Sequence, residues 1–315
     1  MMIPRTDPRR GRIWLRRDLL HEGYDDRAIV ARVRSGELVR IRHGAYTEAE
    51  TWKALDVGGR HALVARPVAA QAKTDVVLSH TSSLCLDEDA PTWGLCLDLV
   101  HVTRVDGRTG RSAAGVAQHR GVILPGDVVE RDGVPAMGPT RAALEVTTVA
   151  GVEASMSVVS YLLHTRQTTA AALQTRYELI KQWPDTLTTD VVLRLSDARF
   201  ESVAECRVFY LCFRERLPMP VPQYEIKDER GRVVARVDFA WPELGVFLEF
   251  DGKVKYERLL RPGQRASDVV VAEKAREELI CRLTGWRCVR LVWADLDRPA
   301  QTAAMIGRAL HPVRG

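Results

Sequence analysis

The sequence lacks the features of membrane-spanning, exported and disulfide-stabilised proteins. No apolar run in its 315 residues approaches the roughly 20 that a membrane-spanning helix needs, and the first residues lack the apolar core of a signal peptide. Its six cysteines include no C-x-x-C pair, the spacing of many zinc and redox sites, so we expect reduced thiols, mostly buried. We therefore expect a cytoplasmic protein without a membrane partner.

The chain also lacks a large excess of one sign of charge, because its net charge is only +5. Residues 1–44 contain eleven Arg and six Asp or Glu, so the excess lies at the N-terminus. Such a distribution permits nucleic-acid binding there without demonstrating it. The length suits two or three domains. We expect an α+β multidomain protein, divided into residues 1–54, 55–199 and 200–315.

The N-terminal segment is predicted to be a winged helix. Apolar spacing predicts a helix over 13–22 and a second helix over 27–34, which Asp25 or Asp26 would cap. Alternation then predicts a strand over 38–42, a turn at 43–44 and a returning strand over 45–47. In a winged helix the second helix enters the major groove and the hairpin lies along the backbone. The basic residues would then contact DNA, although they would also suit a solvated charged face: Arg27, Arg32, Arg34, Arg40 and Arg42.

Two motifs in this segment resemble the N-terminal domain of AbiEi-type antitoxins. They are Gly23-Tyr24 and the run Gly36-Glu-Leu-Val-Arg-Ile-Arg-His-Gly-Ala-Tyr46. These antitoxins belong to type IV toxin–antitoxin systems linked to phage abortive infection. The resemblance implies promoter binding, autoregulation and a toxin protein as a possible partner.

The middle of the chain offers less chemistry. Strands are predicted at 76–80 and 97–103, a helix from Pro139, and a helical stretch over 151–199. Ser79-His80-Thr-Ser82 and Thr140-Arg141 are similar, more weakly, to the region that follows the winged helix in the same antitoxins. The histidines lack metal-ligand spacing, so we expect ordinary polar or core residues at His43, His80, His101 and His119.

The strongest chemical signal is a group of acids on two predicted strands, 233–241 and 246–251. Asp238 would lie near the end of the first strand, and alternation places Glu249, Asp251 and Lys253 on one face of the second. Clustered like charges repel, and a hard divalent cation, Mg²⁺ or Mn²⁺, would reconcile them. We therefore expect Asp238, Glu249 and Asp251 to bind metal for phosphodiester hydrolysis. Solvated acids at strand ends are the alternative.

The predicted order of elements after residue 200 is αβββαβ, the core of the PD-(D/E)XK nucleases. The residues resemble the very-short-patch-repair-like branch of these enzymes at five places. These are Glu201-Ser-x-x-Glu205, Val237-Asp238-Phe-x-Trp-Pro242, Leu248-Glu249-Phe-Asp251-Gly252, Glu273-Lys274-x-Arg276-Glu277 and Gly285-Trp286-Arg-x-Val-Arg290. The resemblance implies a restriction-endonuclease-like fold with Glu205 facing the site. Arg276 and Arg290 would contact phosphate or pair with neighbouring acids.

One departure concerns the catalytic lysine. Asp251 stands where the D-E-x-K pattern would place lysine, so either Lys253 or Lys255 has taken the role, or Asp251-Gly-Lys253 is itself the (D/E)-x-K element. Two functions remain open. The first is a metal-dependent DNA endonuclease in phage defence. The second is a non-catalytic repressor or antitoxin whose last domain only binds DNA or a partner.

Overall fold

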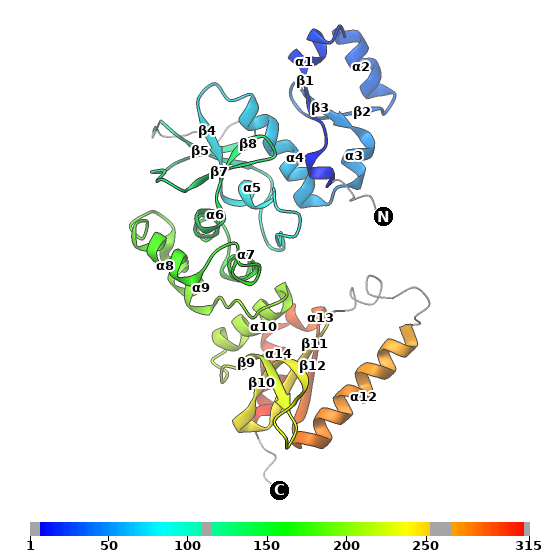
Figure 1. Ribbon diagram of the computed structural model, residues 1–315, viewed down its shortest axis with the longest axis vertical. Coiled ribbons are helices and arrows are strands. Elements are labelled where there is room, and N and C mark those ends of the chain that lie inside the picture. Colours follow the sequence, from blue (N-terminus) through cyan, green and yellow to red (C-terminus); the bar gives the residue numbers. More distant parts are fainter. Residues whose placement is uncertain (1–6, 107, 109–114, 253–265, 312–315) are drawn as a thin grey trace. The chain divides into compact units, whose positions relative to one another are not determined.

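The computed structural model describes residues 7–106, 108, 115–252 and 266–311. It has mixed α/β structure with three sheets among these residues, in keeping with the predicted α+β multidomain class. The chain divides into two compact units, residues 1–194 and 195–315, which are described separately below (Figure 1). Within the described part of the chain, no helix has both the length and the apolar character needed to cross a membrane.

The first unit begins with a small helical and strand segment around one core. Its elements are η1 (Pro8–Arg10), β1 (Trp14–Leu15), α1 (Arg16–His21), α2 (Asp26–Arg34), β2 (Leu38–Arg42) and β3 (Ala45–Glu48). The strands form a sheet in the order β1-β3-β2. Leu19, Ile29 and Leu38 are buried together, and the Asp25 carboxylate caps α2 by accepting from the Ala28 N–H at 2.7 Å, as predicted.

One boundary in this segment was predicted wrongly. Trp14 and Leu15 were assigned to the first helix, but they pair with Tyr46 and Ala45 in the sheet. The helix begins only at Arg16. Their apolar side chains fit either period over so short a run, and the sheet partner lies far along the sequence.

The rest of the first unit is a five-stranded sheet with helices on both faces. Its elements are α3 (Ala49–Ala54), α4 (Val57–Ala70), β4 (Val76–Leu78), α5 (His80–Leu84), β5 (Val100–Arg104), β6 (Val116–Arg120), β7 (Val128–Arg131), β8 (Val134–Met137) and α6 (Pro139–Val146). The strand order is β6-β5-β4-β8-β7. On β4, Val76 and Leu78 pack in a cluster with α4, whereas Val77 belongs to the cluster of the later helices. This alternation places β4 between two layers of core.

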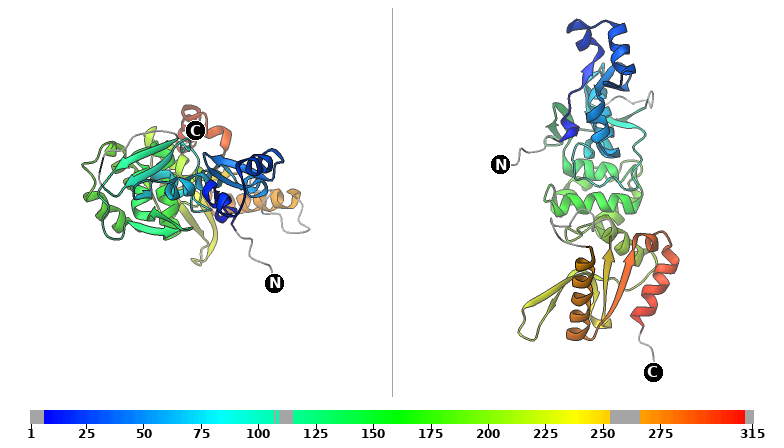
Figure 2. Two further views of the ribbon diagram at one scale, coloured as in Figure 1. Left: turned by 90° about the horizontal axis from the view of Figure 1, so that it is seen from above. Right: turned by 90° about the vertical axis from the view of Figure 1, so that its right-hand side faces the viewer.

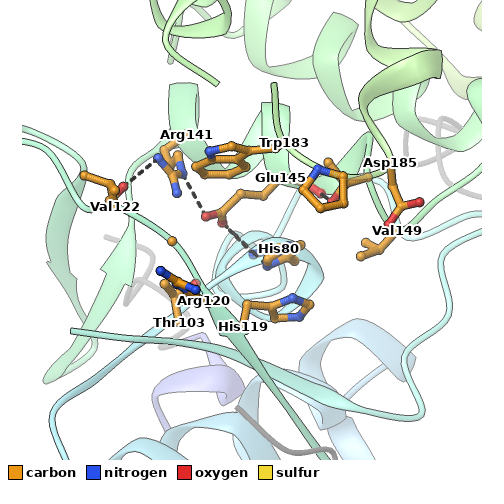
Figure 3. A pocket seen from close by; sticks show the side chains of 13 residues that line it. His80, Thr103, His119, Arg120, Val122, Arg141, Glu145, Val149, Trp183 and Asp185 are labelled. Atoms are coloured by element: carbon orange, nitrogen blue, oxygen red, sulfur yellow. Dashed lines mark hydrogen bonds and ion pairs between the residues drawn. The ribbon is translucent and has the colours of Figure 1, made fainter. Parts of the chain in front are cut away.

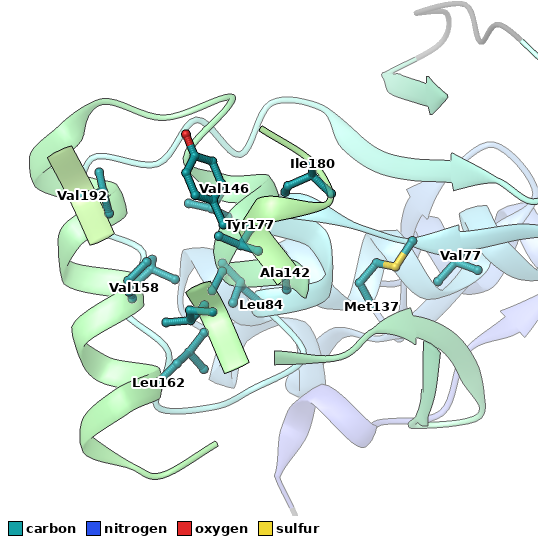
Figure 4. Packing of buried hydrophobic residues seen from close by; sticks show 14 residues of the cluster. Val77, Leu84, Met137, Ala142, Val146, Val158, Leu162, Tyr177, Ile180 and Val192 are labelled. Carbon is teal, nitrogen blue, oxygen red and sulfur yellow. The ribbon is translucent and has the colours of Figure 1, made fainter. Parts of the chain in front are cut away.

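The later helices of this unit form the second layer (Figure 4). They are α7 (Val152–His164), α8 (Ala170–Glu178), η2 (Thr186–Thr188) and α9 (Thr189–Leu195), which confirms the helical stretch predicted for 151–199. Val158, Leu162 and Tyr177 are buried there beside Met137 of β8. Two predicted strands are shorter than expected, since His80 begins α5 and β5 starts only at Val100.

The second unit has the predicted order of helices and strands. Its elements are α10 (Val203–Arg214), β9 (Val221–Lys227), β10 (Val233–Trp241), η3 (Pro242–Leu244), β11 (Val246–Asp251), α12 (Ala266–Thr284), β12 (Arg287–Val292), α13 (Trp293–Leu296) and α14 (Pro299–Leu310). The sheet order is β12-β11-β10-β9, in which only β11 and β12 are parallel. Helix α12 makes the connection between these two strands and lies beside the sheet (Figures 1 and 2), with Ile280 buried against Val237 and Phe247.

Candidate functional site

The predicted acids of the second unit lie on neighbouring antiparallel strands. Phe239 of β10 is opposite Leu248 of β11, and continuing this register puts Asp238 beside Glu249. Asp238 and Glu249 are half-buried. The Phe250 N–H donates to Asp238 Oδ2 at 2.8 Å, which holds the Asp238 carboxylate against β11. Asp251 lies two residues beyond Glu249, on the same face of the strand.

An arginine from the crossover helix joins these acids. Arg276 Nη2 of α12 donates to Glu249 Oε1 at 2.8 Å. Arg290 of β12 pairs with Glu277 of α12 at 2.5 Å, so both arginines pair with acids, one of the two roles predicted for them. Glu249, Asp251 and these charged groups line a small cleft of about 40 Å³. The cleft therefore presents carboxylates and guanidinium groups together.

Glu205 is also part of this group. It is only 4% exposed in the first turn of α10. Its carboxylate accepts from the Ser202 hydroxyl at 2.7 Å and from the Gln223 amide at 2.8 Å. Burial raises the pKa of Glu205, and the nearby negative charge of Asp238 raises it further. Gln223 is held at a φ of 51°, which is unfavourable for a residue with a side chain.

The structure does not describe the whole of the predicted site. Lys253 and Lys255, the two candidates for the catalytic lysine, lie outside the described residues. Asp238, Glu249 and Asp251 do not converge as a tight group of three potential metal ligands. Over the described ranges, the group of three that does so is His80, His101 and His119, in the first unit.

The arginines predicted to bind DNA fall into two sets. Arg27, Arg34 and Arg40 are exposed on α2 and β2. Arg32 is held by Glu37, with Nε to Oε2 at 3.0 Å, and lies over the Tyr24 ring. Arg42 is half-buried, and burial lowers its pKa. The exposed set is better placed to meet phosphate groups.

A larger pocket, of about 550 Å³, lies in the first unit (Figure 3). Arg141 and Glu145, one turn apart on α6, are both almost fully buried in its wall, with Arg141 Nε donating to Glu145 Oε1 at 2.8 Å. Arg141 also approaches Asp127, which Arg176 contacts at 2.6 Å. The guanidinium group of Arg141 lies 4.2 Å from the centre of the Trp183 ring. The wall is therefore a buried, charge-compensated network.

His80 and His119 line the same pocket, and His101 adjoins them. We expected ordinary polar or core residues at these three positions and at His43, and that expectation did not include a cluster. The sequence held a partial signal, because His80 and Arg141 both belong to the short motifs that resemble the antitoxins. Their spacing could not show it, since the three histidines come from one helix start and two different strands.

Comparison with known proteins gives relatives but no function. The chain is 26% identical to the uncharacterized proteins Rv2248 and MT2308, from the H37Rv and CDC 1551 strains of Mycobacterium tuberculosis. The similarity runs over 286 residues, 90% of this chain and 96% of each relative, and so extends over both units. No protein-family model matches the chain.

Proposed function

We propose that this chain binds DNA and that its second unit hydrolyses phosphodiester bonds with a bound Mg²⁺ or Mn²⁺. The observation that carries the proposal is the meeting of Asp238 and Glu249 on neighbouring strands, with Asp251 two residues further along. The αβββαβ order and the resemblance to very-short-patch-repair-like PD-(D/E)XK nucleases support it. In the first unit, the helix pair and hairpin around the exposed arginines support an AbiEi-like winged helix.

The donor atoms suit a hard cation. Carboxylate oxygens are the ligands that Mg²⁺ prefers. Glu249 and Asp251 supply them at a small cleft, and Asp238 lies beside Glu249 on the neighbouring strand. Such a cation neutralises charge on the phosphate and lowers the pKa of the attacking water. Burial and the neighbouring charge of Asp238 raise the pKa of Glu205, which makes its carboxyl easier to protonate than an exposed one. Arg276 would either release Glu249 to the cation or contact the phosphate.

Plasmid cleavage tests this function directly. Purified wild-type protein should nick or cut supercoiled plasmid in Mg²⁺ or Mn²⁺, and Asp238→Asn should abolish cleavage while retaining the fold. Glu243→Gln is the matched control, because Glu243 is an exposed acid just beyond the end of β10. Calorimetric titration should show one Mn²⁺ site in the wild type and none in Asp238→Asn. Equal cleavage by both proteins would refute the assignment.

A second function is favoured by a different observation. Glu249 is already paired with Arg276, and Asp238 already accepts from a backbone N–H, so protein groups compensate part of the acidic charge without a cation. A non-catalytic repressor or antitoxin would have this arrangement. It would bind DNA through the first unit and cut nothing in any divalent metal.

Salt dependence tests the DNA-binding part of both functions. Each phosphate contact releases counterions and contributes about 0.9 to the slope of log K against log salt concentration. Replacing Arg27 and Arg34 together by alanine should therefore reduce the slope by about 1.8. Arg230→Ala, in the exposed β9–β10 turn of the second unit, is the control. An unchanged slope in the double variant would place the DNA surface elsewhere.

A further inference from the structure

Three histidines converge beside the large pocket of the first unit. His101 on β5 and His119 on β6 lie on one face of the sheet, because Thr103, two residues after His101, is the direct partner of His119. His101 Nδ1 and His119 Nε2 are 2.8 Å apart, and the rings of His80 and His119 stack with their centres 3.8 Å apart. One nitrogen from each of the three lies within 4.8 Å of the others.

This cluster holds the neutral form of histidine, which is the form that binds metals. His80 and His101 are buried, and His119 is half-buried. Burial lowers the pKa of all three histidines. The pKa of His101 falls to about 4 through burial and the neighbouring His119, and that of His80 is lowered further by His119 and His101. A neutral imidazole keeps a lone pair on one of its two nitrogens, which is the atom that can bind a metal.

Two further observations set this place apart from an ordinary core. His80 has a φ of 52°, a strained conformation that aims its side chain from the start of α5. Thr103, which is 1% exposed and lines the pocket, has a hydroxyl without a hydrogen-bond partner among the described residues. Buried polar groups are normally satisfied, so this hydroxyl indicates space for a further polar ligand.

We propose that His80, His101 and His119 bind a zinc ion whose remaining coordination position faces the pocket. Zinc takes imidazole nitrogens at about 2.0–2.1 Å in tetrahedral geometry, which sets neighbouring nitrogens about 3.4 Å apart. One nitrogen of each histidine already lies within 4.8 Å of the other two, so modest movements of the side chains reach that spacing. Three protein ligands with one open position is the arrangement of zinc sites that activate water or bind a small ligand.

Metal binding requires a small rearrangement that the site allows. A metal lies in the plane of each imidazole that binds it, so the stacked rings of His80 and His119 must turn apart. The 2.8 Å hydrogen bond between His101 Nδ1 and His119 Nε2 must also break, because the nitrogen that carries its proton has no lone pair for a metal. His119 is the half-exposed member and borders the pocket, which gives its ring room to turn. Ser79 Oγ lies 3.0 Å from His80 Nδ1, and the His80 backbone N–H donates to Glu145 Oε2 at 3.0 Å. The Ser79 hydroxyl is therefore placed to orient the His80 ring, as outer hydrogen-bond partners do beside zinc-bound histidines.

Zinc and cobalt titrations of the untagged, EDTA-treated full-length chain test this proposal. The wild type should bind one Zn²⁺ per chain in calorimetry, and Co²⁺ should give the visible absorption of a tetrahedral site without a thiolate charge-transfer band. His119→Gln should weaken binding by more than about 100-fold, because loss of a ligand exceeds loss of an outer partner. His43→Gln, at an exposed turn, should bind as the wild type does.

Each alternative outcome is distinct. Binding that disappears in Asp238→Asn would belong to the acids of the second unit and would overturn the proposal. So would a folded wild type that binds neither ion, or equal affinities in His119→Gln and the wild type. Zinc should also raise the thermal midpoint of the wild type and not that of His119→Gln, since a ligand of the folded state stabilises it. This readout does not depend on nuclease activity.

Discussion

The two units of this protein gather charged side chains in contrasting ways. In the first unit Asp127 and Glu145 are almost completely buried, and each contacts Arg141. In the second unit Asp238 and Glu249 are half-buried on neighbouring strands, and Glu249, which lines a small cleft, pairs with Arg276. The first arrangement is closed and charge-compensated, and the second remains accessible to solvent.

This difference separates a structural role for charge from a chemical one. A buried ion pair requires excellent geometry, because both charges have lost their hydration, and removal of one partner is costly. A half-exposed pair contributes little to stability, so its members can change partners at small cost. We therefore expect the network around Arg141 to stabilise the wall of the pocket that His80 and His119 line. In the second unit, we expect Glu249 to leave Arg276 when a cation binds the acids.

The largest expected effect comes from breaking the closed network. Arg141→Met should lower the free energy of unfolding by about 3–5 kcal/mol, because Glu145 and Asp127 lose a partner in the interior. Denaturant unfolding measures this effect. Arg120→Met is the matched control, since Arg120 lines the same pocket but is exposed and should change stability by less than about 0.5 kcal/mol. Equal effects of the two substitutions would refute the contrast.

The accessible site was the more predictable of the two. Asp238, Glu249 and Asp251 could be assigned to neighbouring strands because alternation and turn residues fix a local antiparallel pairing, and β10 and β11 have the predicted bounds. Their link to Arg276 depends on how α12 packs, and the sequence left open whether that arginine meets an acid or phosphate. The sequence therefore predicted the strands that carry the acids, but not which charged group pairs with Glu249.

The histidine cluster could not be predicted in the same way. It depends on the parallel pairing of β5 with β6 and on a positive φ at His80. No periodic pattern encodes either feature, since parallel pairing joins strands by long-range packing and a positive φ at a residue other than glycine is uncommon. Trp14 shows the same limit. Its apolar neighbours fit a helix or a strand equally well, and its place in a strand depends on pairing with Tyr46, which is distant in the sequence.

A smaller effect on stability should follow from the raised pKa of Glu205. Its pKa in the folded state lies above the ordinary value of 4.5 because of burial and the charge of Asp238. The stabilising contribution of the protonated form is complete below pH 4.5 and is lost as pH rises through the folded-state pKa. Across that window the free energy of unfolding should fall with pH by at most about 1.4 kcal/mol per unit.

Glu205→Gln should remove that slope. Glutamine keeps the size and an oxygen acceptor but does not ionise, so the stability of the variant relative to wild type should grow as pH rises from 4.5 toward 7. Thermal unfolding of both full-length proteins at several pH values measures the difference. The exposed Glu243→Gln serves as control and should leave the slope unchanged. A constant difference between Glu205→Gln and wild type would show that folding does not raise the pKa of Glu205.

The smallest effect on stability is expected from substitution of Arg276. This substitution nevertheless gives the most direct test of the difference between the buried network of the first unit and the accessible acids of the second. Arg276 is 43% exposed at its side chain, so Arg276→Gln should change the free energy of unfolding by about 0–1 kcal/mol, as measured in urea. The same substitution releases Glu249 Oε1 from its 2.8 Å contact. Calorimetry should then show tighter Mn²⁺ binding, because the cation no longer competes with the guanidinium group. Arg236→Gln is the control. Arg236 lies on the same strand as Asp238, but it pairs with Glu201, at 2.7 Å, and not with the acids of the site. Weaker Mn²⁺ binding in Arg276→Gln would instead mean that Arg276 positions Glu249 for the cation, and the acids would then form a preorganised site rather than an exchangeable one.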